Sequence, residues 1–395
     1  MGSITVQDLA HFAPAHIEII VADYDLAKAG ALVATLMAAP RNPKLPPRAK
    51  LRALKVDLRK AHECAEALSG AFAIINCTQY SWNLAVMELA LRIGAHYLDL
   101  GGLFHTTKKQ LELDQAFRDK KLLAVLGIGA APGITNLLAR HGADALDSVS
   151  EIHVRLAGFD GTMYKNIPAL PVAYSLQTIL EEFSYKPALF TKGQMTFVEP
   201  MSGDTELRFP SPIVKARPMY TIHSEVLTLP ESFKIKGVKE VSFKIAFDPD
   251  FVTKVRFLRD LGMASHEEIS LGGLQVRPIE VINKVAMSQL PATRVGKLKQ
   301  FEILRVVVKG KKSKKPLTKV VDCHTFGMHE WNLGTDTNTG CPPSIAALML
   351  ADGTLKGVGV QAPENVFDTQ SFFKELAKRN MKIKVKTVSG LKFAT

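Results

Sequence analysis

The chain of 395 residues is 47% hydrophobic and 22% charged, a composition typical of soluble globular proteins with room for two domains. No apolar run approaches the roughly 20 residues that a membrane span needs, so we expect no membrane association. Residues 1–12 lack the basic region and apolar core of a secretory signal. Together these features favour a cytoplasmic protein.

The cysteines and the charge pattern bear on two further classes of function. No cysteine stands in a metal-binding spacing, so we expect reduced thiols and no metal site. The cysteines are Cys64, Cys77, Cys323 and Cys341. Part of the formal net charge of +12 lies in residues 309–315, which we predict to form an exposed hairpin loop. The sequence has no basic face with stacking aromatic residues, so we expect no nucleic-acid partner.

The first third of the chain alternates short apolar runs with helical patterns. The runs predicted to be strands are residues 17–21, 51–56, 71–75, 96–99 and 122–126. The segments predicted to be helices are residues 3–12, 25–33, 59–68, 82–93 and 108–120. Asp25 is the expected N-cap of the second helix, and a proline-rich loop follows it at 40–47. This alternation predicts an α/β fold with a doubly wound parallel sheet of the Rossmann type.

Ligands of such sheets bind at the carboxyl ends of the strands. The residues at those ends are Asp23, Asp57, Asn76, Cys77, Thr78, Asp99 and Gly101. Asp23 lies 21 positions after Gly2, where an acidic residue accepts hydrogen bonds from the adenosine ribose and repels a 2′-phosphate. Its alternative role, capping the next helix, is already filled by Asp25. We therefore predict that the cofactor is NAD, with NADP the less favoured choice.

The nucleotide-binding motif is incomplete at the beginning of the chain. A Rossmann motif runs strand, Gly-x-Gly-x-x-Gly, helix, and Gly2 fits its third glycine. The first strand and the other two glycines are missing, so we expect a gap between two strands of the sheet. Three explanations fit: a start downstream of the natural one, a degenerate protein, or a cloning remnant in residues 1–3. We favour the first.

From about residue 150 the pattern changes to runs of strands. They are predicted at residues 151–156, 241–247, 274–277, 301–308 and 317–321, with one helix near 172–183. Few helices among many strands indicate a second, α+β domain with a mixed or antiparallel sheet. A glycine-rich turn at 127–136 opens a helix at 134–145, and two later helices are predicted after residue 342 and at 369–378.

Several segments in order along nearly the whole chain resemble the saccharopine dehydrogenase family, and lysine 6-dehydrogenase in particular. They are residues 21–29, 96–102, 129–136, 221–230, 359–365 and 372–379. The resemblance implies a dinucleotide-binding domain built from residues 1–130 and 335–395. It also implies a substrate-binding and dimerisation domain at 131–334, and we expect a homodimer.

Two departures from the family pattern concern the substrate. Saccharopine reductases tend to have Asp-x-Ser-Tyr where this chain has Asp99-Leu-Gly-Gly102, and Cys-Gly where it has Ile128-Gly129. NADP-using relatives also place a basic residue near the position of Asp23. These differences favour NAD and a substrate other than saccharopine.

The resemblance implies oxidation of a carbon–nitrogen bond in an amino acid or amine. Because the amine must lose a proton, a base with a pKa close to the working pH is expected. Asp99, Tyr80, His105 and His223 are the titratable candidates, and we assign catalysis to Asp99, Tyr80 and His223. Asp99 is the best placed, although it could equally bond the backbone of the Gly101–Gly102 turn.

The remaining site residues divide between cofactor and substrate. The cofactor residues are Gly2, Asp23, Asp57, Asn76, Thr78 and Gly101, and the substrate residues are Thr135, Asn136 and Glu225. A substrate carboxylate would suit Arg155, Arg208 or Arg217, which the sequence does not rank. The alternative function is a non-catalytic binding or scaffold protein that has lost its phosphate loop.

Overall fold

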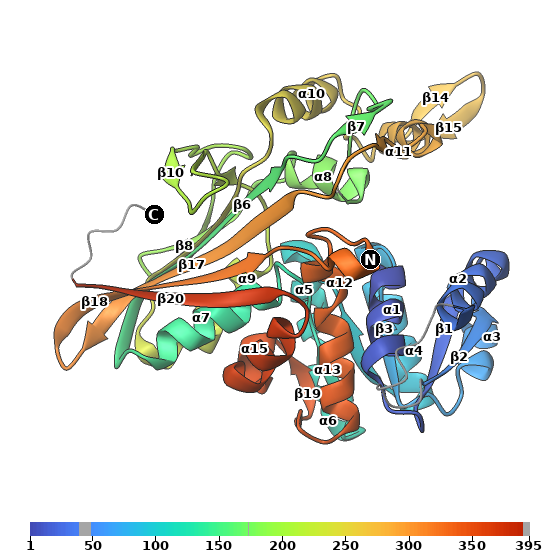
Figure 1. Ribbon diagram of the computed structural model, residues 1–395, viewed down its shortest axis with the longest axis horizontal. Coiled ribbons are helices and arrows are strands. Elements are labelled where there is room, and N and C mark those ends of the chain that lie inside the picture. Colours follow the sequence, from blue (N-terminus) through green and yellow to red (C-terminus); the bar gives the residue numbers. More distant parts are fainter. Residues whose placement is uncertain (39–48, 173, 390–395) are drawn as a thin grey trace. The chain divides into compact units, whose positions relative to one another are not determined.

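The computed structural model describes residues 1–38, 49–172 and 174–389, so the predicted proline-rich loop at 40–47 lies outside the described residues. The chain forms two compact units (Figure 1). Unit 1 comprises Met1–His141 and Asp336–Ile383, and unit 2 comprises Gly142–Thr335 and the segment from Lys384 onward. No helix in these described ranges is both long enough and apolar enough to cross a membrane.

Unit 1 contains only parallel strand pairs among its described residues. One sheet pairs β1 (Glu18–Asp23) with β2 (Lys50–Lys55). The other has the order β19 (Gly359–Gln361), β5 (Leu123–Val125), β4 (His96–Asp99) and β3 (Ala73–Asn76). The predicted parallel α/β fold is therefore confirmed. Strand β19, which pairs with β5, lies near the end of the chain, where no strand was predicted.

The two sheets of unit 1 meet at a break between β1 and β3, which do not pair with each other in the described chain. Apolar side chains join the strands instead. Ile19 and Ile75 belong to one core cluster, and Ile20 and Ile74 belong to another. Because successive side chains of a strand point to opposite faces, the break is packed on both faces of the sheet. This arrangement matches the gap expected from the sequence.

The helices of unit 1 cover these sheets. They are α1 (Gly2–Phe12), α2 (Leu26–Ala38), α3 (Ala61–Ala67), α4 (Asn83–Ile93), α5 (Leu103–Leu111), α6 (Asp114–Asp119), α7 (Ile134–Asp144), α12 (Thr337–Gly340), α13 (Pro342–Ala351), α14 (Pro363–Val366) and α15 (Thr369–Ala377). As predicted, Asp25 caps α2, since its carboxylate accepts hydrogen bonds from the N–H groups of Ala27 and Lys28. The single helix predicted at 108–120 is wrong. It is two helices, and the second is anchored where Asp114 accepts a hydrogen bond from the N–H of Val360 in β19.

Unit 2 is built on an eight-stranded mixed sheet, as predicted. Its strands are β6 (Ser148–Asp160), β8 (Ala188–Thr191), β9 (Gln194–Phe197), β12 (Met219–Tyr220), β13 (Glu240–Ile245), β17 (Gln300–Lys312), β18 (Lys315–Thr325) and β20 (Met381–Ser389). The order is β20-β18-β17-β6-β13-β8-β9, with β12 beside β13. Strands β17 and β18 form the predicted basic hairpin, but its loop is shorter than expected because pairing continues to Lys312 and Lys315.

The helix content of unit 2 was underestimated. Besides α8 (Leu176–Glu182), it contains α9 (Glu225–Ser232), α10 (Pro249–Asp260) and α11 (Pro278–Ser288). The start of α10 could have been predicted from the sequence, because Asp248 caps the helix and proline occupies its first turn. Short strand pairs complete the unit: β7 (Tyr164–Lys165) with β16 (Thr293–Arg294), β10 (Leu207–Arg208) with β11 (Lys215–Ala216), and β14 (Ile269–Leu271) with β15 (Leu274–Val276).

Candidate functional site

The first turn of α1 lies against the end of β3. The N–H groups of Ile4 and Thr5 donate to the carbonyl of Met1 at 2.9 and 3.1 Å, so Gly2 and Ser3 precede the first intrahelical bonds. A Cβ atom on Gly2 would lie 3.2 Å from Cβ of Cys77, closer than most real contacts. A larger residue would therefore push the helix away from the strand, as at the third glycine of a Rossmann motif.

The acidic residues at the ends of β1 and β2 have different partners. The half-buried Asp23 accepts one backbone hydrogen bond, from the N–H of Asp25 at 2.8 Å. Asp57 binds both Nε and Nη2 of Arg59, at 2.8 and 2.6 Å, and these hydrogen bonds lower the pKa of Asp57 to about 2. The Asp57 carboxylate is thus engaged within the protein, and the cofactor roles of Asp57 and Asp23 stay predictions.

A buried polar network lies behind the ends of β3 and β4. The Asn76 side chain donates to Asn83 in α4 at 2.9 Å and accepts from both the N–H and the hydroxyl of Thr78. Asn83 donates to the carbonyl of Gly101 at 3.1 Å. The network therefore fixes two of the loops in which cofactor residues were predicted. Thr78 lies at its rim, whereas the Asn76 side chain is buried within it.

Asp99 is the central residue of this network. Its carboxylate is fully buried and accepts four hydrogen bonds, from the N–H groups of Gly101 and Gly127, the hydroxyl of Tyr97 and the amide of Gln110. Burial raises the pKa of Asp99, and these four donors oppose the rise. A carboxylate held by four protein donors is suited to positioning the surrounding loops.

Glycine is required at the two turns that Asp99 holds. Gly101 and Gly127 adopt φ values of 122° and 72°, which side chains strongly disfavour. A Cβ on Gly101 would lie 2.9 Å from Cδ of Pro132, and a Cβ on Gly127 would overlap the same ring. Pro132 therefore packs directly onto both turns.

The turn that leads into α7 holds the two predicted substrate residues. Thr135 and Asn136 are both buried, and Asn136 accepts from the N–H of Gly133 at 2.9 Å and donates to Glu364 at 2.8 Å. The bond back to Gly133 closes the first turn of the helix in the manner of a capping box. These contacts account for Asn136 as a structural residue, and its assignment to the substrate stays a prediction.

The other two titratable candidates of unit 1 are more accessible than Asp99. Tyr80 begins a short 3-10 helix directly after the β3 loop and is partly buried. His105 lies in α5 and is largely exposed. The pKa of its ring is lowered by partial loss of solvent contact and by the positive charges of Lys108 and Lys109. Their catalytic roles stay predictions.

In unit 2, His223 is the centre of a buried group of ionisable side chains, which we call the His223 cluster. It comprises His223, Glu225, Glu182 and Tyr174. The Nδ1 atom of His223 lies 3.1 Å from a carboxylate oxygen of Glu225, and its Nε2 atom lies 3.8 Å from Glu182. The hydroxyl of Tyr174 donates to Glu182 at 2.6 Å. An imidazole between two carboxylates is suited to accepting and releasing a proton.

The pKa values of Glu182 and His223 in this cluster are both raised. Burial raises the pKa of Glu182 to about 7, opposed by His223 and the Tyr174 hydroxyl. Burial alone would lower the pKa of His223, but attraction to Glu225 and Glu182 outweighs it and raises the value. The ring of His223 also stacks on Phe243 with centroids 3.6 Å apart. Sequence reasoning missed Glu182, because its partner is 41 positions away and no local pattern marks it.

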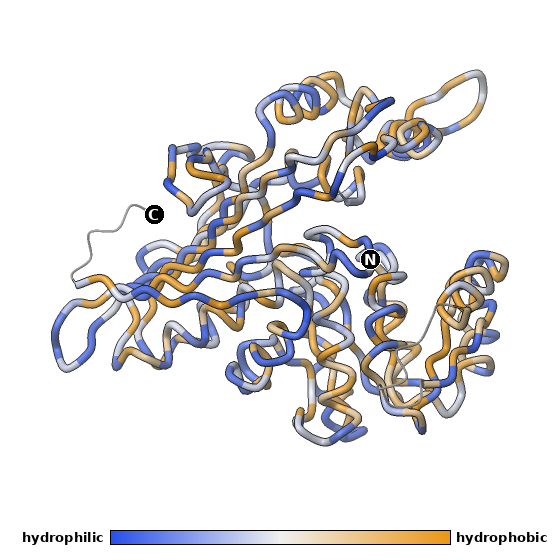
Figure 2. The backbone as a smooth tube through the Cα atoms, viewed as in Figure 1, coloured by the Kyte–Doolittle hydropathy of each residue, from blue (hydrophilic) through white to orange (hydrophobic). Residues whose placement is uncertain are grey.

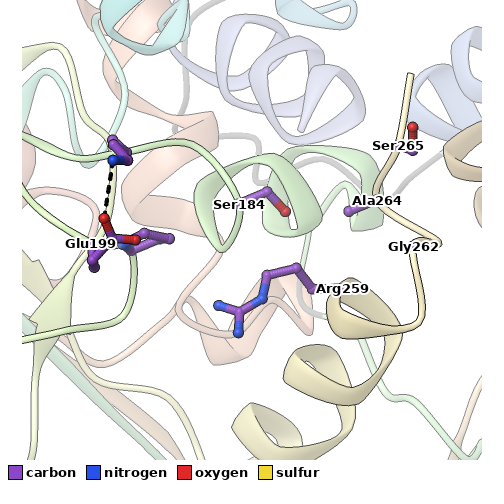
Figure 3. Close-up of a pocket in the computed structure, with 8 residues that line it drawn as sticks. Ser184, Glu199, Arg259, Gly262, Ala264 and Ser265 are labelled. Atoms are coloured by element: carbon purple, nitrogen blue, oxygen red, sulfur yellow. Dashed lines mark ion pairs between the residues drawn. The ribbon is translucent and has the colours of Figure 1, made fainter. Parts of the chain in front are cut away.

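The arginines considered for a substrate carboxylate lie in different surroundings, and the choice among them stays open. Arg155 is buried and donates to the carbonyl groups of Val154 and Ser242, while Arg217 pairs with Asp204. Arg208 is exposed on β10. A different arginine, Arg259, lines a cavity of about 570 Å³ in unit 2 (Figure 3). Lys186 and Glu199 form an ion pair at 3.1 Å in its wall.

One group of side chains in unit 2 has the composition of a metal site. Donor atoms of Glu151, His153 and Glu240 lie within 4.8 Å of one another. However, Nζ of Lys309 lies 2.9 Å from Glu151 and already supplies the positive charge there. The group is better explained as a charge network of the sheet.

Comparison with known proteins identifies the family of this chain. Residues 1–125 match the saccharopine dehydrogenase NADP binding domain, and residues 129–381 match the saccharopine dehydrogenase C-terminal domain. Carboxyaminopropylagmatine dehydrogenase of Synechocystis is 23% identical over 79% of each chain, and carboxynorspermidine synthase of Vibrio cholerae is 24% identical over 73% of this chain and 71% of the relative.

Among solved structures, the saccharopine dehydrogenase (L-Glu forming) of Saccharomyces cerevisiae has a similar fold, with a TM-score of 0.69, 16% identity and 98% of each chain covered. The two domain matches together span most of the chain, in the order expected for this fold. The chain belongs to the saccharopine dehydrogenase family.

Proposed function

We propose that the protein is a pyridine-nucleotide-dependent oxidoreductase that acts on the carbon–nitrogen bond of an amine or amino acid. Family membership supports an oxidoreductase, and both relatives described above bear names that indicate amine substrates. The observation that carries the proposal is the group of loops at the strand ends of unit 1, which the buried Asp99 network holds in place.

The residues of unit 1 fit a dinucleotide in part. The N–H groups of Gly2 and Ser3 would face a pyrophosphate, because the first turn of a helix attracts anions. Asp23 would accept hydrogen bonds from the adenosine ribose, which favours NAD. Thr78 and Gly101 would border the nicotinamide end.

The proposed chemistry removes a hydride and a proton from the substrate. A bound pyridine nucleotide would accept a hydride from the carbon beside nitrogen, while a base of the protein takes the proton from nitrogen, so that a C=N bond is left. We propose His223 as the group that takes this proton, with Glu225 orienting its ring and Glu182 sharing the charge. We propose that Asp99 positions the loops instead of serving as the base, in view of its four donors.

For the substrate, we propose an amine that carries both a carboxylate and a further cationic group. The names of the two relatives describe carboxylated derivatives of agmatine and norspermidine, which are of this kind. The buried acidic residues of the His223 cluster would favour a cation.

The test is a titration of the purified protein with NADH and NADPH, followed by an assay of amine oxidation or imine reduction on carboxylated polyamines. Binding of either nucleotide with turnover supports the proposal. A folded protein that binds neither nucleotide would contradict it and favour the non-catalytic alternative. His223→Gln is expected to lower kcat by at least about 100-fold, since general acid–base groups contribute 10² to 10⁴.

A further inference from the structure

One face of the unit 2 sheet carries a row of charged side chains across four neighbouring strands. Arg155 of β6 is paired with Lys244 of β13 on one side and with Arg305 of β17 on the other. Arg305 is paired in turn with Asp322 of β18. Directly paired residues point to the same face of a sheet, so these four side chains, which we call the cationic row, lie side by side. Figure 2 shows hydrophilic positions among the hydrophobic ones along the long strands of this sheet.

One half of the cationic row is neutral. Nε and Nη2 of Arg305 lie 2.8 and 2.7 Å from the two carboxylate oxygens of Asp322, and Nη1 donates to the carbonyl of Arg208 at 2.9 Å. Arg305 therefore has both its charge partner and its hydrogen bonds. The other half consists of two cations, Arg155 and Lys244, and no carboxylate of the described residues lies within ion-pair distance of either.

Arg155 has a hydrogen-bond donor that the protein does not use. The side chain is 2% exposed. Nη1 donates to the carbonyls of Val154 and Ser242 at 2.7 and 3.3 Å, and Nη2 donates to the hydroxyl of Ser242 at 3.0 Å. The buried Nε–H group has no partner among the residues that the structure describes. Because an unmade hydrogen bond of a buried charged group is costly, this group is a donor available to a ligand.

Lys244 lies beside Arg155 and is only 4% exposed. Its Nζ atom donates to the carbonyl of Gly203 and lies 4.3 Å from the centre of the Tyr220 ring. Burial and the positive charge of Arg155 lower the pKa of Lys244 to about 8, and burial lowers the pKa of Arg155 to about 10. Both shifts have the direction expected for buried cations that lack a close negative charge.

The acidic residues near these two cations are engaged elsewhere. Further along the same face, Glu151 lies 2.9 Å from Nζ of Lys309 and has Glu240 as its neighbour. Asp204 follows Gly203 in the chain, but its carboxylate pairs with Arg217 at 2.9 Å. Buried cations are rarely left without a negative charge, so a charge from outside the chain is the remaining source.

The cationic row lies on the other face of the sheet from the His223 cluster. Phe243 precedes Lys244 in β13 and therefore points to the opposite face, where the ring of His223 stacks on it. A ligand of the cationic row is thus distinct from a substrate whose proton His223 takes. The exposed Gly203 and the half-buried Tyr220 cover Lys244, so the site lies close to the protein surface.

We propose that Arg155 and Lys244 bind a small oxyanion of the phosphate class, which accepts hydrogen bonds from Nε of Arg155 and Nζ of Lys244. Hydrogen phosphate carries two negative charges and matches the two cations that have no carboxylate partner. Its oxygens are strong acceptors for charged donors, and arginine is well suited to binding them. This inference goes beyond the proposed enzymatic function, because the site uses none of the residues assigned to catalysis.

The test measures binding of inorganic phosphate to the purified protein by equilibrium dialysis, together with its melting temperature. The melting temperature is expected to rise more with phosphate than with sodium chloride at the same ionic strength, since a ligand of the folded state stabilises it. Lys244→Met removes one cation and keeps an apolar stem, so it should weaken phosphate binding about tenfold or more. The matched control is Lys239→Met, at an exposed lysine just before β13, which should leave phosphate binding unchanged.

Equal stabilisation by phosphate and sodium chloride would overturn the proposal, and so would unchanged phosphate binding by Lys244→Met. If Lys244→Met does not fold, Arg155→Lys takes its place, because it keeps the positive charge but has no Nε donor. The same loss of binding is expected, and tight binding by this variant would also contradict the proposal. Phosphate that NADH displaces would lie at the nucleotide site of unit 1, which would overturn the assignment to the cationic row.

Discussion

The guanidinium group of Arg379 and the carboxylate of Asp8 form a fully buried ion pair, with Nε and Nη2 at 2.8 and 2.7 Å from the two carboxylate oxygens. Arg379 also lies over the ring of Phe12 at 3.9 Å. The pair joins α1, at the beginning of the chain, to the end of α15. It therefore closes unit 1 by linking its two sequence segments.

Asp8→Ala is expected to destabilise the protein by about 3–5 kcal/mol, because it leaves the buried charge of Arg379 with the partly exposed Glu375 as its remaining ion-pair partner. Chemical denaturation measures the change. The control is Lys378→Ala, which removes the neighbouring exposed pair with Glu375 and should cost about 0–1 kcal/mol. A similar small loss in both variants would show that the buried pair contributes little.

Asp99→Asn is expected to lower stability by about 1–3 kcal/mol. The new NH₂ group would face hydrogen-bond donors at a place where a carboxylate oxygen accepted their hydrogen bonds. Gln110 is least able to adapt, since its amide oxygen already accepts from Asn83. Thermal unfolding checks this, with the exposed Asp119→Asn as control. A variant that keeps its melting temperature but loses about 100-fold in kcat would restore the catalytic assignment of Asp99.

Asp23 is expected to make NAD bind more tightly than NADP, because a carboxylate repels a 2′-phosphate. Fluorescence titration with both reduced cofactors measures the ratio. Asp23→Ser should reduce it by about tenfold or more, whereas Asp25→Asn, which keeps an N-cap, should leave it unchanged. Tighter binding of NADP by the unchanged protein would contradict the assignment.

The His223 cluster is expected to make stability fall as the pH rises through neutrality. Glu182 has a pKa raised to about 7, so the folded state holds a proton that the unfolded state releases near pH 4.5. His223, whose pKa is also raised, loses its stabilising charge in the same direction. The protonated forms are thus favoured by folding, and their contribution is lost on going from about pH 5 to pH 8.

Melting temperatures of the unchanged protein and Glu182→Gln, measured between pH 5 and pH 8, isolate this effect. As the pH rises, the melting temperature of the unchanged protein should fall relative to that of the Glu182→Gln variant. Equal pH dependence would show that Glu182 is ionised throughout. The exposed Glu231→Gln serves as the matched control, because Glu231 pairs only at the surface with Lys234.

The break between β1 and β3 predicts the effect of adding a strand. A form extended before Met1 by a short apolar strand ending in Gly-x-Gly should melt at a higher temperature and bind NAD more tightly. The added strand would pair with both free edges, and its glycines would supply N–H groups to the pyrophosphate. If the extended form binds NAD no more tightly than the 395-residue form, the placement of Gly2 in the fingerprint is wrong.

Local sequence patterns determined much of unit 1. Apolar runs of strand length, the Asp25 cap and the strand-end residues are encoded within a few positions of one another, so the parallel sheet and the gap beside β1 were predictable. The mixed sheet of unit 2 was predictable for the same reason. The position of α11 was not, because the packing of Ile279 and its neighbours in the core outweighs a weak local pattern.

The tertiary structure alone decided which polar side chains meet. Asp99 could be a base or a structural residue as far as its sequence neighbours show, and donors from Gln110 and Gly127 favour the second role. Likewise, His223 meets Glu182 from another part of unit 2, and Arg379 meets Asp8 across 371 positions. Hydrogen bonds and ion pairs act over a few ångströms, and a linear sequence does not specify which distant residues come within that range.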